Sequence, residues 1–279
     1  MGVRHPQLTT VAREYVLARS VLLDALDALG GQRAAVVLVG AQAVYLHAGE
    51  ADLATAPMTT DADLTIDVRR VIAEPDLAAA MHQGGFEPGD QPGSWIGRFD
   101  VAVDLMVAPH QSGRTTPSAR AGRIPGHATN AVRIARGLEA ALVDRDDREI
   151  TALDPTDERG YIVSIAGPAA LLVAKLIKLR ERVADERAAR RSRVEAKDAL
   201  DVLRLLRGVE VDVFAAGFAR HRGDPYATAV TENALEFLRQ SGMDDGGRLA
   251  QLINAASGGD RTLPASLAAL TEQLLSRCG

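Results

Sequence analysis

Apolar residues recur along this chain with two different periods. Residues 9–31 place them at helical spacing and predict a helix that ends at Gly30-Gly31. The β-branched run 34–39 predicts a buried strand, and the segments 61–68 and 100–108 predict two further strands. The first part of the chain is therefore expected to combine a sheet with helices.

The helical period dominates after Gly167. Pro168 suits the first turn of a helix, and long helical patterns follow over 167–191 and 194–208. The expected fold class is α+β, with a domain of residues 1–165 that carries the sheet and a helical domain of residues 166–279.

Shorter patterns complete the first part. Further helices are expected over 41–49 and 74–85, and a long loop rich in Ser, Thr, Gly, Arg and Pro is expected over 109–130. Additional strands are predicted over these segments: 94–99, 137–143, 148–153 and 161–166.

Composition narrows the functional classes. The 279 residues are 47% hydrophobic, which is enough for a sizeable core, and the net charge of -5 argues against a strongly basic nucleic-acid binder while leaving room for a local basic patch. The single cysteine, Cys278, excludes an internal disulfide and a cysteine-based metal site.

The first ten residues lack the apolar core of a signal peptide, and the apolar stretches 34–49 and 163–177 are too short and interrupted to span a membrane. A cytoplasmic protein that does not enter a membrane is expected.

Three carboxylates stand out in the strand patterns. Asp61 and Asp63 are two residues apart on a predicted strand, so they project from the same face, with Asp67 further along. Asp104 is the one charge among apolar neighbours on a later strand. If the two strands are adjacent, Asp104 completes a cluster that could hold Mg²⁺ for phosphoryl or nucleotidyl transfer.

A strand that ends at Gly40-Ala41 and continues into a helix precedes this cluster. The amides at the start of such a helix bind phosphate well, so the two features together suggest a nucleoside triphosphate site. Neither GxxxxGK[ST] nor GxGxxG occurs, which disfavours the common ATPase and dinucleotide-binding classes.

The order of these motifs resembles the DNA polymerase β-like nucleotidyltransferase superfamily. Its pattern is hG[GS] followed by Dh[DE]h, and this chain offers Gly40-Ala41 and then Asp61-Ala62-Asp63-Leu64. Ala41 departs from the pattern because it lacks the hydroxyl of the usual Ser. Four further features are more similar to one branch, the AbiEii/MenT-like toxins. They are the long spacer, Thr59 in T-x-D-x-D, Lys175 in an apolar helix, and Lys197-Asp198 followed by Asp201.

The resemblance implies a nucleotidyltransferase fold, with a mixed sheet flanked by helices and a helical C-terminal domain that contributes Lys and Asp to the site. Asp61 and Asp63 would bind Mg²⁺, and Asp104 would complete a second metal site or act as the base on the attacking hydroxyl. Lys175 would contact the triphosphate, and Asp198 could orient Lys175 or help bind the nucleotide. Other contacts to the phosphates, nucleotide or acceptor are expected from Gly40, Ala41, Thr59, Arg180 and Arg193.

The implied activity is the transfer of a nucleoside monophosphate from an NTP to an acceptor hydroxyl, with release of pyrophosphate. The toxin resemblance implies the 3′ end of tRNA as acceptor, a role in a bacterial toxin–antitoxin system, and a cognate antitoxin as partner. Residues 178–197 carry eight basic side chains, which favours RNA, although four acidic residues dilute them.

Other interpretations stay open at this stage. The acceptor could be an aminoglycoside-like small molecule or a protein side chain, and the absence of a hydroxyl at Ala41 is compatible with a relative that binds nucleotide without transferring it.

Individual residues also have purely structural alternatives. Asp61, Asp63 and Asp104 could edge solvated strands, Lys175 could extend from an apolar helix to solvent, and Asp198 could lie on a helix surface. Asp201 is more readily explained by pairing with Arg204 or Lys197, and His47 by a satisfied place in the core.

Overall fold

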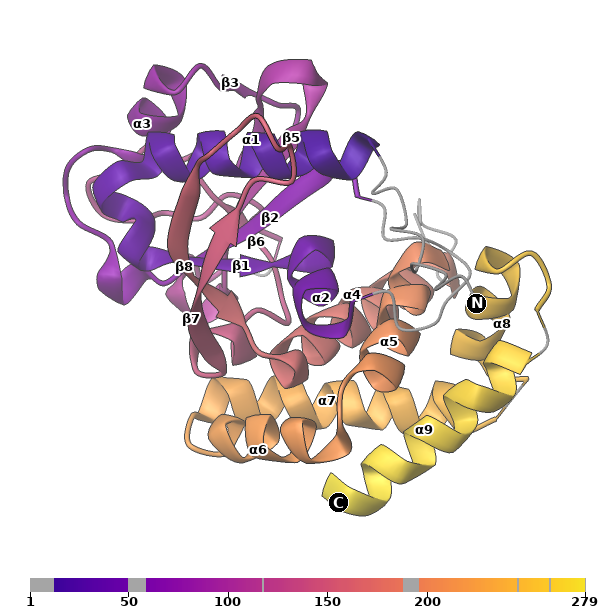
Figure 1. Ribbon diagram of the computed structural model, residues 1–279. Helices are drawn as coiled ribbons and strands as arrows, with labels where there is room; N and C mark the ends of the chain where they lie inside the picture. Colours follow the sequence, from indigo (N-terminus) through magenta and orange to yellow (C-terminus); the bar gives the residue numbers. More distant parts are fainter. Residues whose placement is uncertain are drawn as a thin grey trace, which may run out of the picture.

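One mixed β-sheet organises the N-terminal part of the protein, and helices surround it (Figure 1). The computed structural model describes residues 13–49, 59–116, 118–187, 196–244, 246–260 and 262–278. The strands are β1 Val36–Val39, β2 Asp61–Ile66, β3 Glu87–Pro88, β4 Ser94–Ile96, β5 Ala102–Val107, β6 Arg133–Ile134, β7 Arg145–Thr151 and β8 Gly160–Ala166.

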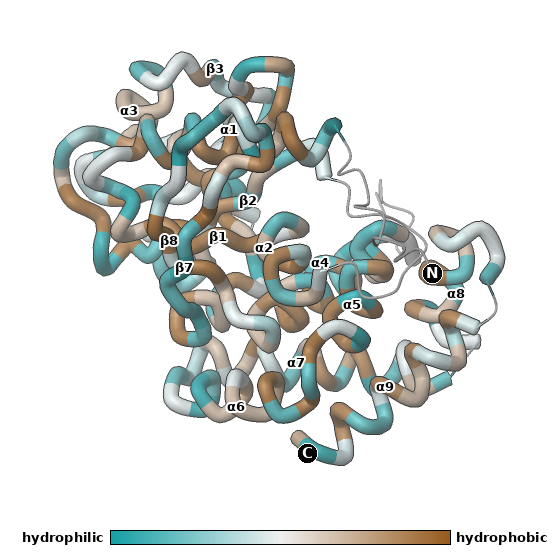
Figure 2. Tube along the Cα trace, in the orientation of Figure 1, coloured by the Kyte–Doolittle hydropathy of each residue, from teal (hydrophilic) through white to brown (hydrophobic). Residues whose placement is uncertain are grey.

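The strand order is β3-β4-β5-β2-β1-β8-β7, and β6 pairs with β5. The pairs β2–β5, β1–β8 and β5–β6 are parallel, whereas β1–β2 and β7–β8 are antiparallel. The four residues of β1 are all buried, which explains their uniformly apolar side chains. At one edge, β7 is largely charged and exposed, and Figure 2 shows it as mostly hydrophilic. Charge on an edge strand disfavours pairing with another chain.

Three helices belong to the N-terminal part: α1 Arg13–Leu29, α2 Gly40–Ala48 and α3 Leu77–Gln83. The first packs on the sheet through β2, β5 and β8, and α2 connects the sheet with the helices that follow. Those helices are α4 Pro168–Arg187, α5 Ala196–Gly208, α6 Val211–His221, α7 Pro225–Gly242, α8 Arg248–Ala256 and α9 Thr262–Cys278. A continuous cluster of buried apolar residues runs from the sheet into this helical region.

Most of the expected elements are confirmed, including a mixed sheet flanked by helices and a helical C-terminal region, and the fold is compatible with α+β. The strand predicted over 137–143 is wrong, because Ala140–Leu142 form a 3-10 helix there. Gly137 has a positive φ of 86°, which is not a strand conformation, and a Cβ at this position would lie only 3.0 Å from the Ile177 Cβ of α4. The strand predicted over 94–99 ends at Ile96, because Phe99 adopts a positive φ in the turn that follows.

The division into domains at residue 166 and the nucleotidyltransferase fold stay predictions. No helix within the described ranges is long and apolar enough to cross a membrane.

Candidate functional site

The strand registers bring the three predicted carboxylates together. Asp61 and Asp63 lie two residues apart on β2, and Asp63 is directly opposite Asp104 on the parallel strand β5. Residues paired in this way project from the same face of a sheet. The same face also carries Arg133 of β6, which is the register partner of Met106, two residues beyond Asp104.

Gly40 lies against this cluster at the start of α2. Its φ is +69°, and a Cβ at this position would overlap the Asp63 carboxylate. Both observations require glycine, first for the backbone conformation and second for the close approach of the carboxylate. The preceding residue, Val39, provides no side-chain cap for the helix, and Ala41 is buried in its first turn. The amides of that turn are therefore left without a capping side chain.

Buried polar side chains position Asp61. The Thr59 hydroxyl, which is fully buried, donates a hydrogen bond of 2.6 Å to the Asp61 carboxylate. Gln42 of α2 donates to the Asp61 carbonyl oxygen at 3.1 Å and accepts from the Arg19 guanidinium at 2.9 Å. Thr59 is thus a hydrogen-bond partner of the Asp61 carboxylate, and its contact with phosphate stays a prediction. Arg19 and Gln42 support the Asp61 backbone, which the motifs did not indicate.

The charges around Asp61 and Asp63 indicate whether a divalent cation fits beside these two carboxylates. Desolvation and then repulsion from Asp61 raise the pKa of Asp63 to about 6; Asp104 adds to the rise, while Lys178 and Lys175 oppose it. Within the described part of the chain, the Asp63 carboxylate has neither a hydrogen-bond partner nor an ion-pair partner. Two adjacent carboxylates with uncompensated charge suit an Mg²⁺ ion, which is bound through one or two carboxylates plus phosphate oxygens. Asp61 and Asp63 therefore fit the expected ion.

Asp104 has a different environment. The Arg133 guanidinium donates a short hydrogen bond to its carboxylate, and Nη2 also contacts the Met106 sulfur at 3.4 Å. Among the described residues, no three His, Cys, Asp or Glu side chains are placed together to hold a metal ion. Asp104 thus lies beside Asp63 but is paired with Arg133, and its role as a metal ligand stays a prediction.

Lys175 lies in a buried ionic network between α4 and α5. Its ammonium contacts Asp198 at 2.8 Å and Asp201 at 2.7 Å, and its side chain is only 8% exposed. Burial alone would lower the pKa of Lys175, but the charges of Asp201 and Asp198 outweigh burial and raise it. Arg204 pairs with Asp201 at 3.2 Å and completes this part of the network. The ammonium is thus charged and held by two carboxylates.

Lys178 is the more accessible lysine. It lies one helical turn after Lys175, its side chain is 42% exposed, and its ammonium is 3.0 Å from Asp198. Its charge opposes the pKa rise of Asp63 more strongly than that of Lys175 does. The sequence offered Lys178 only as part of a basic run, although its i, i+3 spacing from Lys175 could have indicated a shared helix face.

The other predicted residues lie elsewhere. The Arg180 guanidinium donates a hydrogen bond of 2.9 Å to Asn233 of α7, and its contact with the nucleotide or acceptor stays a prediction. His47 is half-buried and its Nε2 bonds the Ala166 carbonyl oxygen at 2.9 Å, so its hydrogen bonding is satisfied as expected, although it lies at the edge of the core. Asp67 is buried and pairs with Arg69 and Arg145, so it is a structural carboxylate. Arg193 falls outside the described residues.

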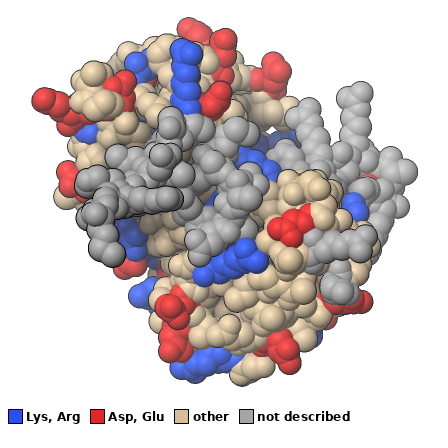
Figure 3. All heavy atoms as spheres, turned by 45° about the vertical axis from the view of Figure 1, so that its right-hand side comes forward, with Lys and Arg blue, Asp and Glu red and all other residues tan. Residues whose placement is uncertain are grey.

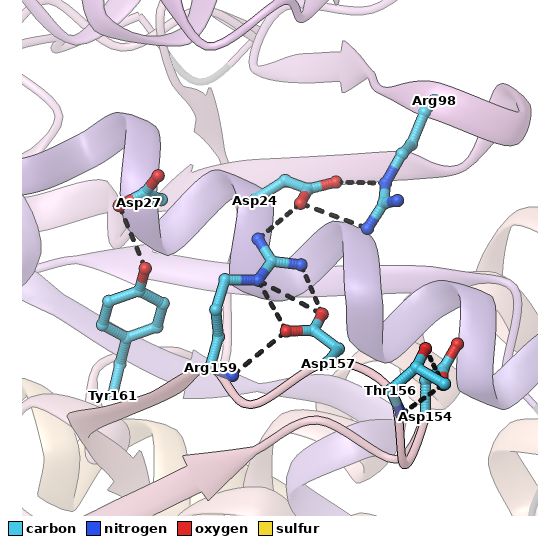
Figure 4. Close-up of polar contacts among 8 residues, drawn as sticks. All are labelled: Asp24, Asp27, Arg98, Asp154, Thr156, Asp157, Arg159 and Tyr161. Atoms are coloured by element: carbon cyan, nitrogen blue, oxygen red, sulfur yellow. Dashed lines mark hydrogen bonds and ion pairs between the residues drawn. The ribbon is translucent and has the colours of Figure 1, made fainter.

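A second polar cluster joins α1 to the segment before β8 (Figure 4). Asp24 lies between Arg98 at 2.6 Å and Arg159 at 2.7 Å, and Arg159 also pairs with Asp157. A shallow cavity of about 310 Å³ borders Asp24 and Arg159. These charges already neutralise one another, so the cluster is explained by attachment of the segment to α1.

No protein-family model matches this sequence, and no similar protein was found among curated sequences. The resemblance to nucleotidyltransferases therefore depends on the motifs and on the geometry described above.

Proposed function

We propose that the protein is an Mg²⁺-dependent nucleotidyltransferase that moves a nucleoside monophosphate from an NTP to an acceptor hydroxyl and releases pyrophosphate. The observation that carries this proposal is the position of Asp61 and Asp63 beside the start of α2, with Gly40 against the Asp63 carboxylate. Mg²⁺ bound there would neutralise triphosphate oxygens and polarise the phosphate that is attacked.

The chain's own residues have separate tasks in this proposal. Thr59 and Gln42 hold Asp61 in position, and the first amides of α2 are available to the phosphates. Lys178 contacts the triphosphate as an accessible point charge, while Lys175 is held by Asp198 and Asp201 and supplies positive potential.

We further propose the 3′ end of tRNA as the acceptor, with the protein acting as the toxin of a bacterial toxin–antitoxin system and a cognate antitoxin as partner. The support is the motif resemblance together with basic side chains near the site, Lys178 and Arg182 among them. On the face shown in Figure 3, basic and acidic side chains are interspersed. Binding to RNA is therefore expected to be local and salt-dependent.

The test is incubation of the purified protein with Mg²⁺, each α-labelled NTP and total tRNA. Label on tRNA is expected with the wild type and with Asp146→Asn, a matched control at an exposed position of β7. Asp61→Asn should reduce transfer at least a thousandfold while the protein stays folded. Full activity of Asp61→Asn would refute the mechanism. Labelling of an aminoglycoside, but not of tRNA, would retain the chemistry and change the acceptor.

A further inference from the structure

The Asp104–Arg133 pair is the feature of the site that the proposed function does not use. Arg133 is fixed at its backbone, since β6 pairs with β5 at Met106 and Val107. Its side chain is 32% exposed and that of Asp104 is 25% exposed, so both side chains are partly exposed. A guanidinium on a carboxylate beside Asp63 places a fixed positive charge within the carboxylate cluster.

We infer, on the basis of the proposed function, that Asp104 is not a cation ligand and that Arg133 replaces a second metal ion. The site would then take one divalent cation, at Asp61 and Asp63, and a phosphate group contacted by Arg133. Asp104 acts as a positioning residue that orients the guanidinium.

Two observations support this assignment. The first is that the Asp104 carboxylate is already neutralised by Arg133, whereas the Asp63 carboxylate has no partner within the described residues. A second cation at Asp104 would have to displace a charge-assisted hydrogen bond and would be repelled by the guanidinium.

The second observation concerns the donors that remain on Arg133. Nη2 bonds Asp104 and Met106, while Nε and Nη1 have no hydrogen-bond partner in the described structure. A guanidinium presents five N–H donors in a planar fork that matches phosphate oxygens, and one edge held by a carboxylate leaves other donors for a ligand. This combination indicates a phosphate-bearing ligand.

The test counts bound Mn²⁺ by electron paramagnetic resonance on the full chain. The samples contain a mixture of the four α,β-methylene nucleoside triphosphates, which cannot be cleaved at the reacting bond. One Mn²⁺ per chain is expected for the wild type. Asp61→Asn should weaken Mn²⁺ binding at least tenfold, whereas Asp104→Asn should leave it within threefold of the wild type.

Replacing the guanidinium separates a metal-substituting role from a structural one. Arg133→Gln should weaken analogue binding about tenfold and allow a second Mn²⁺ to bind at Asp104. The double variant Arg133→Gln/Asp104→Asn should bind one Mn²⁺ again. A purely structural ion pair would not produce this gain of a second Mn²⁺ in Arg133→Gln and its loss in the double variant. Circular dichroism of each variant verifies folding.

Two results would overturn this inference alone: two Mn²⁺ ions in the wild type, or loss of Mn²⁺ binding in Asp104→Asn. Absence of both Mn²⁺ and analogue binding in the folded wild type would instead refute the proposed function, and the inference with it.

Discussion

At the scale of single residues, the chain places carboxylates in contrasting electrostatic environments. Asp63 lies next to Asp61, and its pKa is raised to about 6. Asp67, four residues later, is buried beside Arg69 and Arg145. Burial alone would raise the pKa of Asp67, but hydrogen bonds from the two arginines outweigh burial and hold it at about 2. Asp63 is therefore available to bind a cation, whereas Asp67 stabilises the fold.

Asp67→Asn should destabilise the protein in a pH-dependent manner. Because the folded pKa of Asp67 is below the ordinary 3.8, its charge contributes stability above about pH 4, and this contribution is lost as the pH falls towards 2. The shift corresponds to about 2 kcal/mol at pH 7. Urea unfolding from pH 7 to pH 2 should show the variant's deficit disappearing at the acid end. A deficit that stays constant down to pH 2 would contradict the role of the charge.

Gly40→Ala should be more disruptive than an ordinary substitution at a positive φ. The matched control is Gly30→Ala, because Gly30 has a φ of +47° and a Cβ at this position would have no atom within 4 Å. The control should lose about 1 kcal/mol, the cost of a left-handed backbone for alanine. Gly40→Ala should lose at least twice as much and should also weaken Mn²⁺ binding, because its Cβ displaces Asp63. Equal losses in denaturant unfolding would show that the contact with Asp63 is unimportant.

At the scale of elements, helical spacing brings the charges of α4 and α5 together. Lys175, Lys178 and Arg182 lie at i, i+3 and i+7 on α4, and all three contact Asp198 of α5. Burial alone would raise the pKa of Asp198, but the charges of Lys175 and Lys178 outweigh it and lower that pKa. The network therefore combines packing between the helices with positive charge near Asp63.

Substitutions of the two lysines should separate these roles. Lys175→Met removes a buried cation from two carboxylates and should cost about 3 kcal/mol in unfolding free energy. Lys178→Met, at a half-exposed position, should cost less than 1 kcal/mol and reduce nucleotide affinity about tenfold. Calorimetric titration with the uncleavable analogues measures affinity, and urea unfolding measures stability. Unchanged nucleotide affinity in Lys178→Met would exclude its contact with the triphosphate.

Strands and helices with a clear hydrophobic period could be predicted from the sequence, whereas the neighbours of each strand in the sheet could not. Strands were predicted over 34–39 and 61–68, and β1 Val36–Val39 and β2 Asp61–Ile66 lie within these runs because β-branched and alternating residues suit a sheet. The alignment of Asp63 with Asp104 was expected only on the condition that β2 and β5 are neighbours, and 35 or more residues separate the two strands. Arg133 was not predicted, because its two-residue strand has no recognisable period and its position depends on tertiary contacts.

At the scale of the whole molecule, one buried carboxylate joins the sheet to the helical region. Asp144 precedes β7, accepts a hydrogen bond of 3.1 Å from the Ala170 amide of α4, and pairs with Arg220 of α6 at 2.6 Å. His221 lies 3.5 Å from the same carboxylate. Burial alone would raise the pKa of Asp144, but the neighbouring His221 ring and the hydrogen bond from Arg220 outweigh burial and lower it. The packing between the two parts therefore includes a buried charge beside the apolar cluster.

Asp144→Asn should weaken this junction while leaving the candidate site chemically intact. Replacing a buried charge that has several donors should cost about 3 kcal/mol, whereas Asp146→Asn, exposed and two residues further on, should change stability by less than about 0.5 kcal/mol. Thermal unfolding and limited proteolysis would reveal the weakened packing, and Mn²⁺ binding by the folded Asp144→Asn protein should match the wild type. A residue that only joins the sheet to the helices affects packing and has no direct effect on Asp61 and Asp63. Loss of Mn²⁺ binding in an Asp144→Asn protein of unchanged stability would therefore contradict this structural role and assign Asp144 to the cation site.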